Sequence, residues 1–247
     1  MKIKEIWAKS ILSKSRIYDY AVNPYVGCSH GCRYCYAAFM KRFTGHTERW
    51  GEFVDVRINA PELLAREIAK RKKGRVWVSG VCDPYQRAEQ KYGLTGRCLE
   101  ILVENGWPVT VQTKSPLVLR DSRILEKSEE AEVGFTITTA DEGIRRLFEP
   151  GAPPIRDRID ALGVLHSKGI RTFAMIAPVL PGAEDLVKLL AGRVDHVLAD
   201  RLNYHYADRI YRENRMEWAK EEPFFLYAAE ELERGFKGQG IAVQVLY

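Results

Sequence analysis

The sequence contains no continuous apolar run of about eighteen residues, the length that a membrane-spanning helix needs. Residues 1–7 mix charged and apolar side chains and lack the continuous apolar core of a secretory signal peptide. Neither sign of charge dominates, because 38 lysines and arginines against 33 aspartates and glutamates leave a formal net charge of +5. This weakly basic balance gives only slight support to a polyanionic partner. We therefore expect a cytoplasmic protein that does not contact membranes.

Cysteine is scarce, and its number is odd: five residues among 247. That count excludes a disulfide framework of the kind that holds small secreted domains together. Internal repeats, low-complexity tracts and linker-like segments are also lacking, so we expect residues 1–247 to form a single domain. The length is ordinary for an α/β barrel and sufficient to bury a large core.

Three of the five cysteines are concentrated in one short segment, at Cys28, Cys32 and Cys35. The spacing C-x3-C-x2-C lets a single loop arrange three thiolates around one inorganic centre. Closed electron-transfer clusters of the four-iron type are held by four cysteines. Three ligands leave one iron free to bind another molecule, much as a catalytic zinc ion keeps one position open.

A zinc site is the alternative for these cysteines, with His30 or His46 as the fourth ligand. Zinc sites usually pair two ligand couples that are separated by a dozen or more residues. The sequence shows no second couple.

Residues 23–37, NPYVGCSHGCRYCYA, resemble the radical S-adenosylmethionine (SAM) superfamily. The signature of that superfamily is C-x3-C-x2-C with an aromatic residue, here Tyr34, before the last cysteine. The longer string resembles the spore photoproduct lyase-related branch, also described as DNA repair photolyase-like. Similarity continues through roughly residues 10–185. It is carried further by the stretches VCDPYQ at 81–86, TKS at 113–115, EPGAP at 149–153 and APVLPG at 177–182.

This resemblance implies an enzyme that cleaves SAM reductively at a [4Fe–4S] cluster. Cys28, Cys32 and Cys35, in the loop of residues 24–37, would hold the cluster. The resulting deoxyadenosyl radical abstracts a hydrogen atom from the substrate, and the protein supplies orientation and protection from water. The resemblance also implies an external electron donor of the flavodoxin or ferredoxin kind.

Short β-branched runs alternate with helical patterns along the chain. The predicted strands are residues 18–23, 75–79, 109–113, 133–139, 171–177, 196–202 and 241–247. The predicted helices are residues 61–71, 95–105, 116–127, 156–168, 183–191 and 223–236. This order predicts a partial (β/α)6 TIM-like barrel of the radical SAM type, with its site at the C-terminal ends of the strands. Residues 43–59 show no clear element, which indicates a lid or a surface excursion.

Each part of SAM needs a partner at those strand ends. Lys114 directly follows the strand at 109–113 and offers a cation for the carboxylate. The resemblance supports this role, because a Thr-Lys pair at this strand end contacts the SAM carboxylate in spore photoproduct lyase-like enzymes. Thr136 and Thr138, two apart on one strand, share a face and suit the ribose. The remaining candidates are Ser79, Gly80 and Asp83 for the amine, and Tyr34, Pro178 and Val179 around the adenine. Strand-end packing or capping is the alternative for each.

Cys82 lies at the end of the second predicted strand. Spore photoproduct lyase uses a cysteine on that strand to return a hydrogen atom to its product radical. Here the position is offset by about one residue, and its neighbours depart from the pattern of that enzyme. Cys82 is therefore a candidate hydrogen donor, a SAM-pocket residue or a small buried apolar side chain.

The segment of residues 204–212 interleaves tyrosines with arginines after a predicted strand end. Such a segment suits stacking on bases and binding phosphates, or else it is an ordinary capping loop. Together with the branch, it favours nucleic acid as substrate, in DNA lesion repair or RNA modification. The alternatives are a radical SAM enzyme acting on a small metabolite or peptide, and a non-catalytic iron–sulfur redox protein. Residues 204–247 are expected to close the barrel and contact the substrate.

Overall fold

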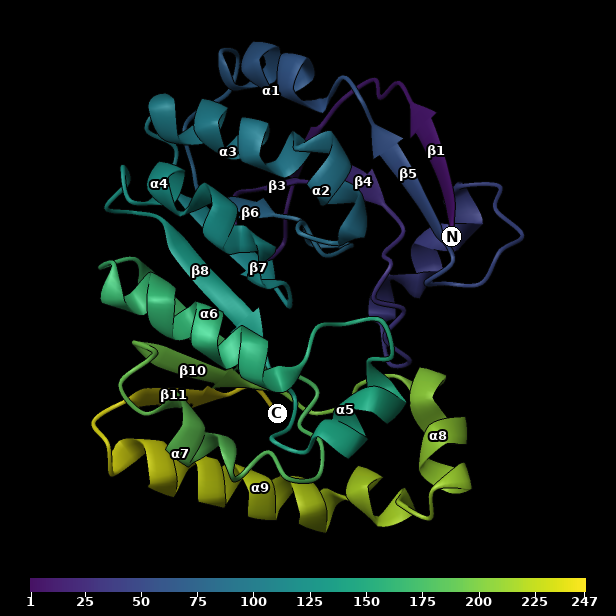
Figure 1. The fold of residues 1–247 in the computed structure, drawn as a ribbon, viewed down its shortest axis with the longest axis vertical. Coiled ribbons are helices and arrows are strands. Elements are labelled where there is room, and N and C mark those ends of the chain that lie inside the picture. The colour runs from purple at the N-terminus through teal and green to yellow at the C-terminus, as the bar shows by residue number, and fades with distance from the viewer.

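Eight strands form the main sheet of the computed structural model, which describes residues 1–247. Their order is β11-β10-β9-β8-β7-β6-β3-β2, and only β2 runs antiparallel to its neighbour. The sheet is open, with β11 and β2 at its edges (Figure 1). The strands are β2 Leu12–Lys14, β3 Tyr20–Val22, β6 Val76–Val78, β7 Val109–Thr113, β8 Glu132–Thr136, β9 Arg171–Ile176, β10 His196–Ala199 and β11 Ala242–Val245.

Helices connect successive parallel strands and surround the sheet (Figure 1). α3 packs against β7, α6 against β8 and β9, and α9 against β11. This alternation around an open parallel sheet confirms the predicted partial barrel. The helices are α1 Ala60–Ile68, α2 Arg87–Tyr92, α3 Leu94–Glu104, α4 Ser122–Leu125, α5 Glu142–Phe148, α6 Ile155–Ser167, α7 Leu186–Leu190, α8 Asp208–Glu213 and α9 Glu222–Lys237. Short 3-10 helices cover η1 Tyr36–Phe43, η2 Pro116–Asp121, η3 His205–Ala207 and η4 Glu217–Lys220.

The predicted strand at 109–113 coincides with β7, and each of the other predicted strands overlaps an observed one. The prediction of a single helix over 116–127 is wrong, because this segment consists of the 3-10 helix η2 followed by the short α-helix α4. At the start of η2, the Ser115 hydroxyl accepts a hydrogen bond from the backbone N–H of Leu117 and caps a tight 3-10 turn.

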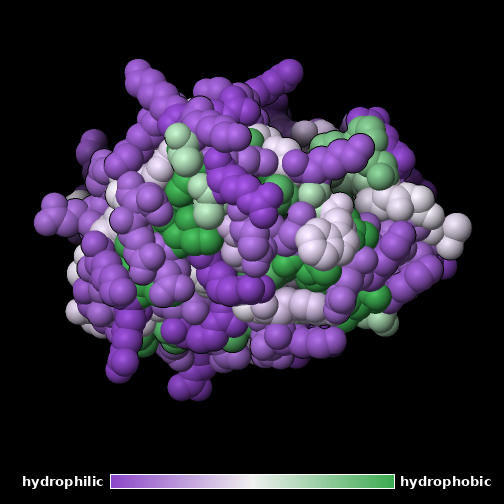
Figure 2. All heavy atoms as spheres, turned by 90° about the horizontal axis from the view of Figure 1, so that it is seen from above, coloured by the Kyte–Doolittle hydropathy of each residue, from purple (hydrophilic) through white to green (hydrophobic).

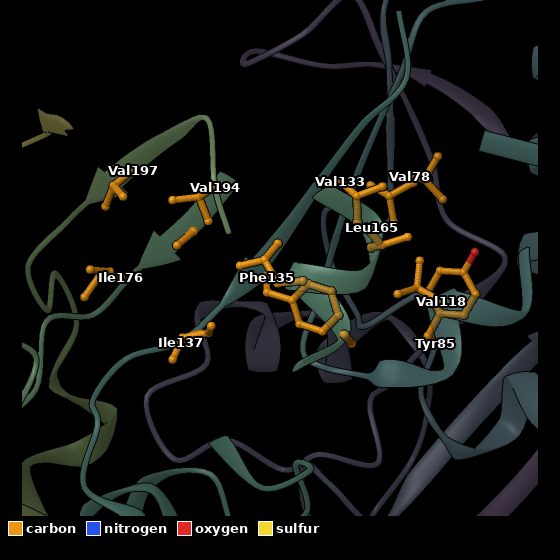
Figure 3. Packing of buried hydrophobic residues seen from close by; sticks show 14 of the residues in the cluster. Val78, Tyr85, Val118, Val133, Phe135, Ile137, Leu165, Ile176, Val194 and Val197 are labelled. Atoms are coloured by element: carbon orange, nitrogen blue, oxygen red, sulfur yellow. The ribbon is translucent and has the colours of Figure 1, made fainter. Parts of the chain in front are cut away.

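The core lies between the sheet and its helices. Val133 and Phe135 of β8 lie near Leu165 of α6, and all three side chains are completely buried (Figure 3). Because strand side chains alternate between faces, Gly134 lies on the opposite face of β8. A Cβ atom there would lie 2.0 Å from the ring of Phe173, its partner on β9. Glycine at this position therefore lets Phe173 fill the inner side of the sheet.

A second, three-stranded sheet has the order β1-β5-β4. It consists of β1 Lys2–Ile6, β5 Phe53–Arg57 and β4 Tyr25–Val26. The prediction that residues 43–59 lack a regular element is therefore wrong for the second half of that segment. Phe53, Val54 and Val56 are completely buried, and β5 is the middle strand of the sheet.

No helix combines the length and the apolar character that a membrane span requires. Hydrophilic side chains cover most of the face seen in Figure 2, which views the molecule of Figure 1 from above. Apolar atoms reach this face only in separate small areas, which is usual for the surface of a folded domain.

Candidate active site

The cysteine loop, residues 24–37, follows the C-terminal end of β3 and leads into η1. Two glycines let it pass close to the neighbouring segment. Gly27 has a φ of 86°, and a Cβ atom there would lie 2.4 Å from the backbone oxygen of Phe53. Gly31 has a φ of 58°, and a Cβ atom would lie 3.3 Å from Cα of Gly51. Both positions combine a left-handed backbone with a close approach, which only glycine accepts without strain.

Hydrogen bonds hold the loop from two sides. The buried Gln86 side chain accepts from the backbone N–H of Ser29 at 2.8 Å and donates to the carbonyl of Gly27 at 3.0 Å. On the other side, the backbone N–H of Gly151 donates to the carbonyl of His30 at 2.9 Å. The loop is thus fixed between the segment after β6 and the segment after α5, both at the C-terminal edge of the sheet.

All three loop cysteines are free thiols, with Cys28 and Cys32 buried and Cys35 partly buried. Burial raises the pKa of Cys28 well above its usual value and the pKa of Cys32 to about 12. The pKa of Cys28 also responds to the charges of Cys32 and Cys35, so the three sulfur atoms belong to one electrostatic group. Thiols with raised pKa bind metal as thiolates only by releasing their protons. Metal binding at this loop is therefore expected to release protons.

The two histidines considered as zinc ligands have other partners. His46 lies 3.0 Å from Glu48 through Nδ1 and 2.9 Å from Asp55 through Nε2, so both ring nitrogens are engaged. His30 Nδ1 lies 3.4 Å from a carboxylate oxygen of Asp83. No three His, Cys, Asp or Glu side chains are grouped tightly enough for a single metal ion. A four-iron cluster makes a different demand, because each cysteine binds a different iron.

Lys114 directly follows β7 and reaches towards the cysteine loop. Its Nζ lies 3.8 Å from Oε1 of Glu149 and 5.7 Å from the ring centre of Tyr34. Burial disfavours the charged lysine, but the neighbouring Cys32 sulfur and the Glu149 carboxylate outweigh this effect and raise its pKa. Lys114 is therefore a permanent, nearly buried cation beside the cysteine loop.

Asp83 connects the ends of β6 and β7 with the cysteine loop. Its carboxylate accepts hydrogen bonds from the Tyr85 N–H at 2.9 Å, the Thr113 hydroxyl at 2.7 Å and the Lys114 N–H at 2.7 Å, and it faces His30. Burial opposes its ionisation, but His30 and the hydrogen bonds prevail and lower the pKa of Asp83 to about 2. Asp83 thereby fixes the backbone of Lys114, and its predicted contact with the SAM amine stays a prediction.

Sequence reasoning missed a buried ion pair behind Lys114. Arg158 Nη1 lies 2.6 Å from Oε2 of Glu149, and both side chains are completely buried. Oε1 of Glu149 accepts hydrogen bonds from the hydroxyls of Tyr34 and Thr138. Burial raises the pKa of Glu149, but Arg158, Lys114 and the Tyr34 hydroxyl outweigh burial and lower it. Glu149 is therefore a charged carboxylate, and its negative charge stabilises the protonated form of Lys114.

A family model of the radical SAM superfamily matches residues 22–190, a range that contains the cysteine loop, Lys114 and Glu149. The chain belongs to the radical SAM superfamily.

An uncharacterized protein of Methanocaldococcus jannaschii is 35% identical over 188 residues, which cover 75% of this chain and 71% of the relative. An uncharacterized protein of Mycobacterium bovis is 29% identical over 193 residues, which cover 73% of this chain. The matched region spans only 57% of the mycobacterial protein's length.

Solved radical SAM structures share the fold. Spore photoproduct lyase complexed with dinucleoside spore photoproduct superimposes with a TM-score of 0.73 over 98% of this chain and 82% of that chain, at 14% identity. SuiB of Streptococcus suis bound to precursor peptide SuiA superimposes with a TM-score of 0.61 over 91% of this chain and 48% of that chain, at 15% identity.

The cofactors of the radical SAM superfamily are a [4Fe–4S] cluster and SAM, and both structural neighbours are also known with SAM bound. The chain is therefore an enzyme of the radical SAM type with these two cofactors. The thiol chemistry of the cysteine loop fits the cluster, and the Lys114 ammonium group fits the SAM carboxylate.

Four further residues predicted to contact SAM lie after strand ends of the radical SAM fold. Ser79 follows β6, is buried, and has an unusual positive φ of 67°. The backbone oxygen of Gly80 accepts a hydrogen bond from the Tyr36 hydroxyl. Pro178 and Val179 follow β9 and are both buried. These positions agree with strand-end roles, and their contacts with SAM stay predictions.

The prediction that Thr136 and Thr138 lie on one strand is wrong, because β8 ends at Thr136. The Thr136 hydroxyl accepts a hydrogen bond from Gln112 at 3.1 Å, whereas Thr138 donates to Glu149 at 3.3 Å. Both hydroxyls thus have partners within the protein, and the ribose contacts of Thr136 and Thr138 stay predictions.

Cys82 is close to the cysteine loop in space. Its thiol donates to the backbone oxygen of Tyr25 at 3.4 Å and lies 3.5 Å from the hydroxyl of Ser79. Burial raises its pKa to about 12, against the influence of Ser79. Cys82 is therefore a protonated S–H group at the site, as a hydrogen-atom donor must be.

A stack of three tyrosines begins at the residue after Cys35. Tyr36 stacks on Tyr204 with ring centres 6.3 Å apart, and Tyr204 stacks on Tyr206 at 5.8 Å with an angle of 13° between the rings. The rings are 40%, 49% and 53% exposed, respectively. Beside the stack lies a cavity of about 270 Å³ whose lining includes Arg201 and Lys220. We call these three residues the tyrosine stack.

Proposed function

We propose that Cys28, Cys32 and Cys35 bind the [4Fe–4S] cluster and that the enzyme acts on nucleic acid. With SAM bound, the cluster supplies a deoxyadenosyl radical for hydrogen abstraction. The chain's own part is to bind and orient both cofactors and to exclude water from them. The loop that carries the cysteines is suited to this, because hydrogen bonds from Gln86 and Gly151 fix it before any cofactor binds.

We assign the SAM carboxylate to Lys114. Glu149 keeps this lysine charged, and Asp83 fixes its backbone through the hydrogen bond to the Lys114 N–H. Ser79, Gly80 and Asp83 would accept from the SAM amine, and Thr136 and Thr138 would contact the ribose. Tyr34, Pro178 and Val179 would then enclose the adenine, and Cys82 would return a hydrogen atom to the product if the reaction is of the lyase type.

Lys114→Ala is expected to raise the dissociation constant for SAM between about tenfold and a hundredfold. This range corresponds to the binding free energy that a hydrogen bond to a charged group contributes. Isothermal titration of SAM into the reconstituted protein measures this change. Lys127→Ala, at an exposed lysine after α4, serves as the control and should leave SAM affinity unchanged. Unaltered SAM binding in Lys114→Ala would refute the assignment.

The nucleic-acid substrate rests on one observation, the tyrosine stack. Its rings form an exposed platform that starts at the residue after Cys35. The middle ring, Tyr204, lines a cavity that also contains Arg201, which pairs with Glu222, and Lys220, which pairs with Asp208. Every base offers a flat face for such stacking, and the cations suit phosphates. Anaerobic incubation with SAM and reductant tests the proposal. Deoxyadenosine formation should rise when DNA or RNA is added, and equal turnover without nucleic acid would argue against it.

Tyr204→Ala and Tyr206→Ala are each expected to weaken binding of a single-stranded oligonucleotide, because a stacked base contributes about 1–3 kcal/mol. That is roughly five- to a hundredfold in the dissociation constant. Tyr227→Ala is the matched control, since Tyr227 is 51% exposed on α9, outside the stack. Fluorescence anisotropy at two salt concentrations reads out both the stacking and the phosphate contribution.

A peptide substrate is the second candidate, because SuiB shares the fold and is bound to a precursor peptide. An aromatic platform also binds aromatic peptide side chains. The salt series distinguishes the two: oligonucleotide affinity falls steeply with salt through release of counterions, whereas a neutral peptide shows little dependence.

A further inference from the structure

Glu149 directly follows α5, and the backbone on both sides of it is bound to the cysteine loop. The Phe148 carbonyl accepts a hydrogen bond from the Arg33 N–H at 2.8 Å, and the Gly151 N–H donates to the His30 carbonyl at 2.9 Å. The Glu149 side chain is completely buried. Its carboxylate therefore has a fixed place against the loop that carries the three cysteines.

One oxygen of this carboxylate, Oε2, is occupied by Arg158, whose Nη1 lies 2.6 Å away. Backbone carbonyls hold the arginine in turn. Its Nη1 donates to the carbonyl of Thr136 at 3.1 Å, and its Nε and Nη2 donate to the carbonyl of Pro153 at 2.9 and 2.7 Å. The guanidinium is thus bound at all three nitrogens, so it fixes the orientation of the carboxylate and leaves Oε1 to other partners.

Three side chains from three segments of the chain meet at Oε1 of Glu149. The hydroxyl of Tyr34 in the cysteine loop donates to it, and so does the hydroxyl of Thr138 after β8, at 3.3 Å. Nζ of Lys114, which follows β7, lies 3.8 Å away. These residues are the ones assigned above to the adenine, the ribose and the carboxylate of SAM. One buried oxygen atom therefore connects the groups proposed to contact three parts of the cofactor.

We propose that Glu149 is a positioning residue for SAM, which sets the mutual placement of Tyr34, Thr138 and Lys114. This inference rests on the SAM contacts proposed above. The two kinds of partner make different demands on the carboxylate. The hydroxyls of Tyr34 and Thr138 need an acceptor oxygen, whether charged or neutral, whereas the Lys114 ammonium group needs a negative charge. Substitutions that separate the acceptor from the charge should therefore separate the binding of the two halves of SAM, methionine and deoxyadenosine.

Glu149→Gln combined with Arg158→Met keeps an acceptor oxygen and removes both buried charges. The dissociation constant for methionine should rise about tenfold, because Lys114 loses its ionic partner, and that for deoxyadenosine should stay within about twofold of the wild type. Glu149→Leu combined with Arg158→Met also removes the acceptor, so both constants should rise about tenfold. Titration calorimetry of each fragment into the cluster-loaded protein, at equal iron content, measures these constants.

Glu89→Gln is the matched control. Glu89 is also completely buried, accepts a hydrogen bond from a tyrosine, Tyr25, and pairs with an arginine, Arg120, at 2.5 Å. Arg120 keeps Asp121 as a partner at 2.7 Å, so the variant leaves no unpaired cation. The hydrogen bonds and ion pair of Glu89 involve none of the residues assigned to SAM. Both fragments should therefore bind this variant as they bind the wild type.

Equal shifts for the two fragments in the glutamine variant, or no shift in either, would overturn the proposal. Tyr34→Phe provides a second test that does not depend on the folding of the leucine variant. Loss of this hydroxyl alone should raise the deoxyadenosine constant about three- to tenfold and leave the methionine constant unchanged. An unaltered deoxyadenosine constant there would count against the proposal. Wild-type protein that binds iron but neither SAM nor its fragments would instead refute the proposed SAM site, so the two failures are distinguishable.

Discussion

Replacing any one of Cys28, Cys32 and Cys35 by alanine is expected to abolish formation of deoxyadenosine from SAM. Each cysteine provides the ligand for one iron, and His46 cannot replace it, because both of its ring nitrogens lie against carboxylates. Loss of one thiolate therefore opens a second iron and destabilises the whole cluster. Iron and sulfide content after anaerobic reconstitution, the cluster absorbance and mass spectrometry of the SAM products check this.

Cys98→Ala is the control for these variants. Cys98 is completely buried on α3 within the apolar core, so its loss is expected to lower the free energy of unfolding by about 1 kcal/mol and to leave the cluster intact. Cys82→Ala should also keep the cluster, since Cys82 is not one of the three predicted ligands and its thiol donates to the backbone oxygen of Tyr25. Full iron content and undiminished SAM cleavage in all three loop variants would show that the cluster is bound elsewhere.

The features that could be predicted from the sequence depend on residues close together in the chain. The cysteine loop is one short segment with an unambiguous spacing, and β7 is a five-residue β-branched run whose bounds match the prediction. Lys114 could be placed at a strand end for the same reason. The alternation of such local units is what specifies a partial barrel.

The features that could not be predicted depend on distant partners. Strand β5 is stabilised by pairing with β1, where Phe53 lies opposite Lys2, and Asp55 interrupts its apolar pattern because it bonds to His46. The close approach of Gly51 to Gly31 likewise joins the cysteine loop to a segment twenty residues further along the chain. For the Glu149–Arg158 pair a signal did exist: Arg158 lies on the same face of α6 as the buried Ile155 and Leu162, where a charged side chain needs a partner.

Arg158→Met is expected to lower the free energy of unfolding by about 3–5 kcal/mol, because it leaves the buried Glu149 carboxylate without its main counter-charge. That is a large share of the stability of an ordinary domain. Chemical denaturation of the cofactor-free protein measures the loss. Arg193→Met is the matched control: its partner Asp160 lies 3.2 Å away, but both side chains are about half exposed, so the change should stay within about 1 kcal/mol.

Adding Glu149→Gln to Arg158→Met is expected to recover part of the lost stability, because no unpaired charge then remains in the interior. The pH dependence gives an independent test. The pKa of Glu149 is lowered in the folded state, so its stabilising contribution is present above the unfolded-state pKa of about 4.3 and is lost as the pH falls through the lower folded-state value. Without Arg158 the folded-state pKa rises, and this loss of stability in acid should shrink. If Arg158→Met destabilises the protein no more than Arg193→Met does, and keeps the wild-type acid dependence, the ion pair does not hold Glu149 charged, and another group must keep Lys114 a cation.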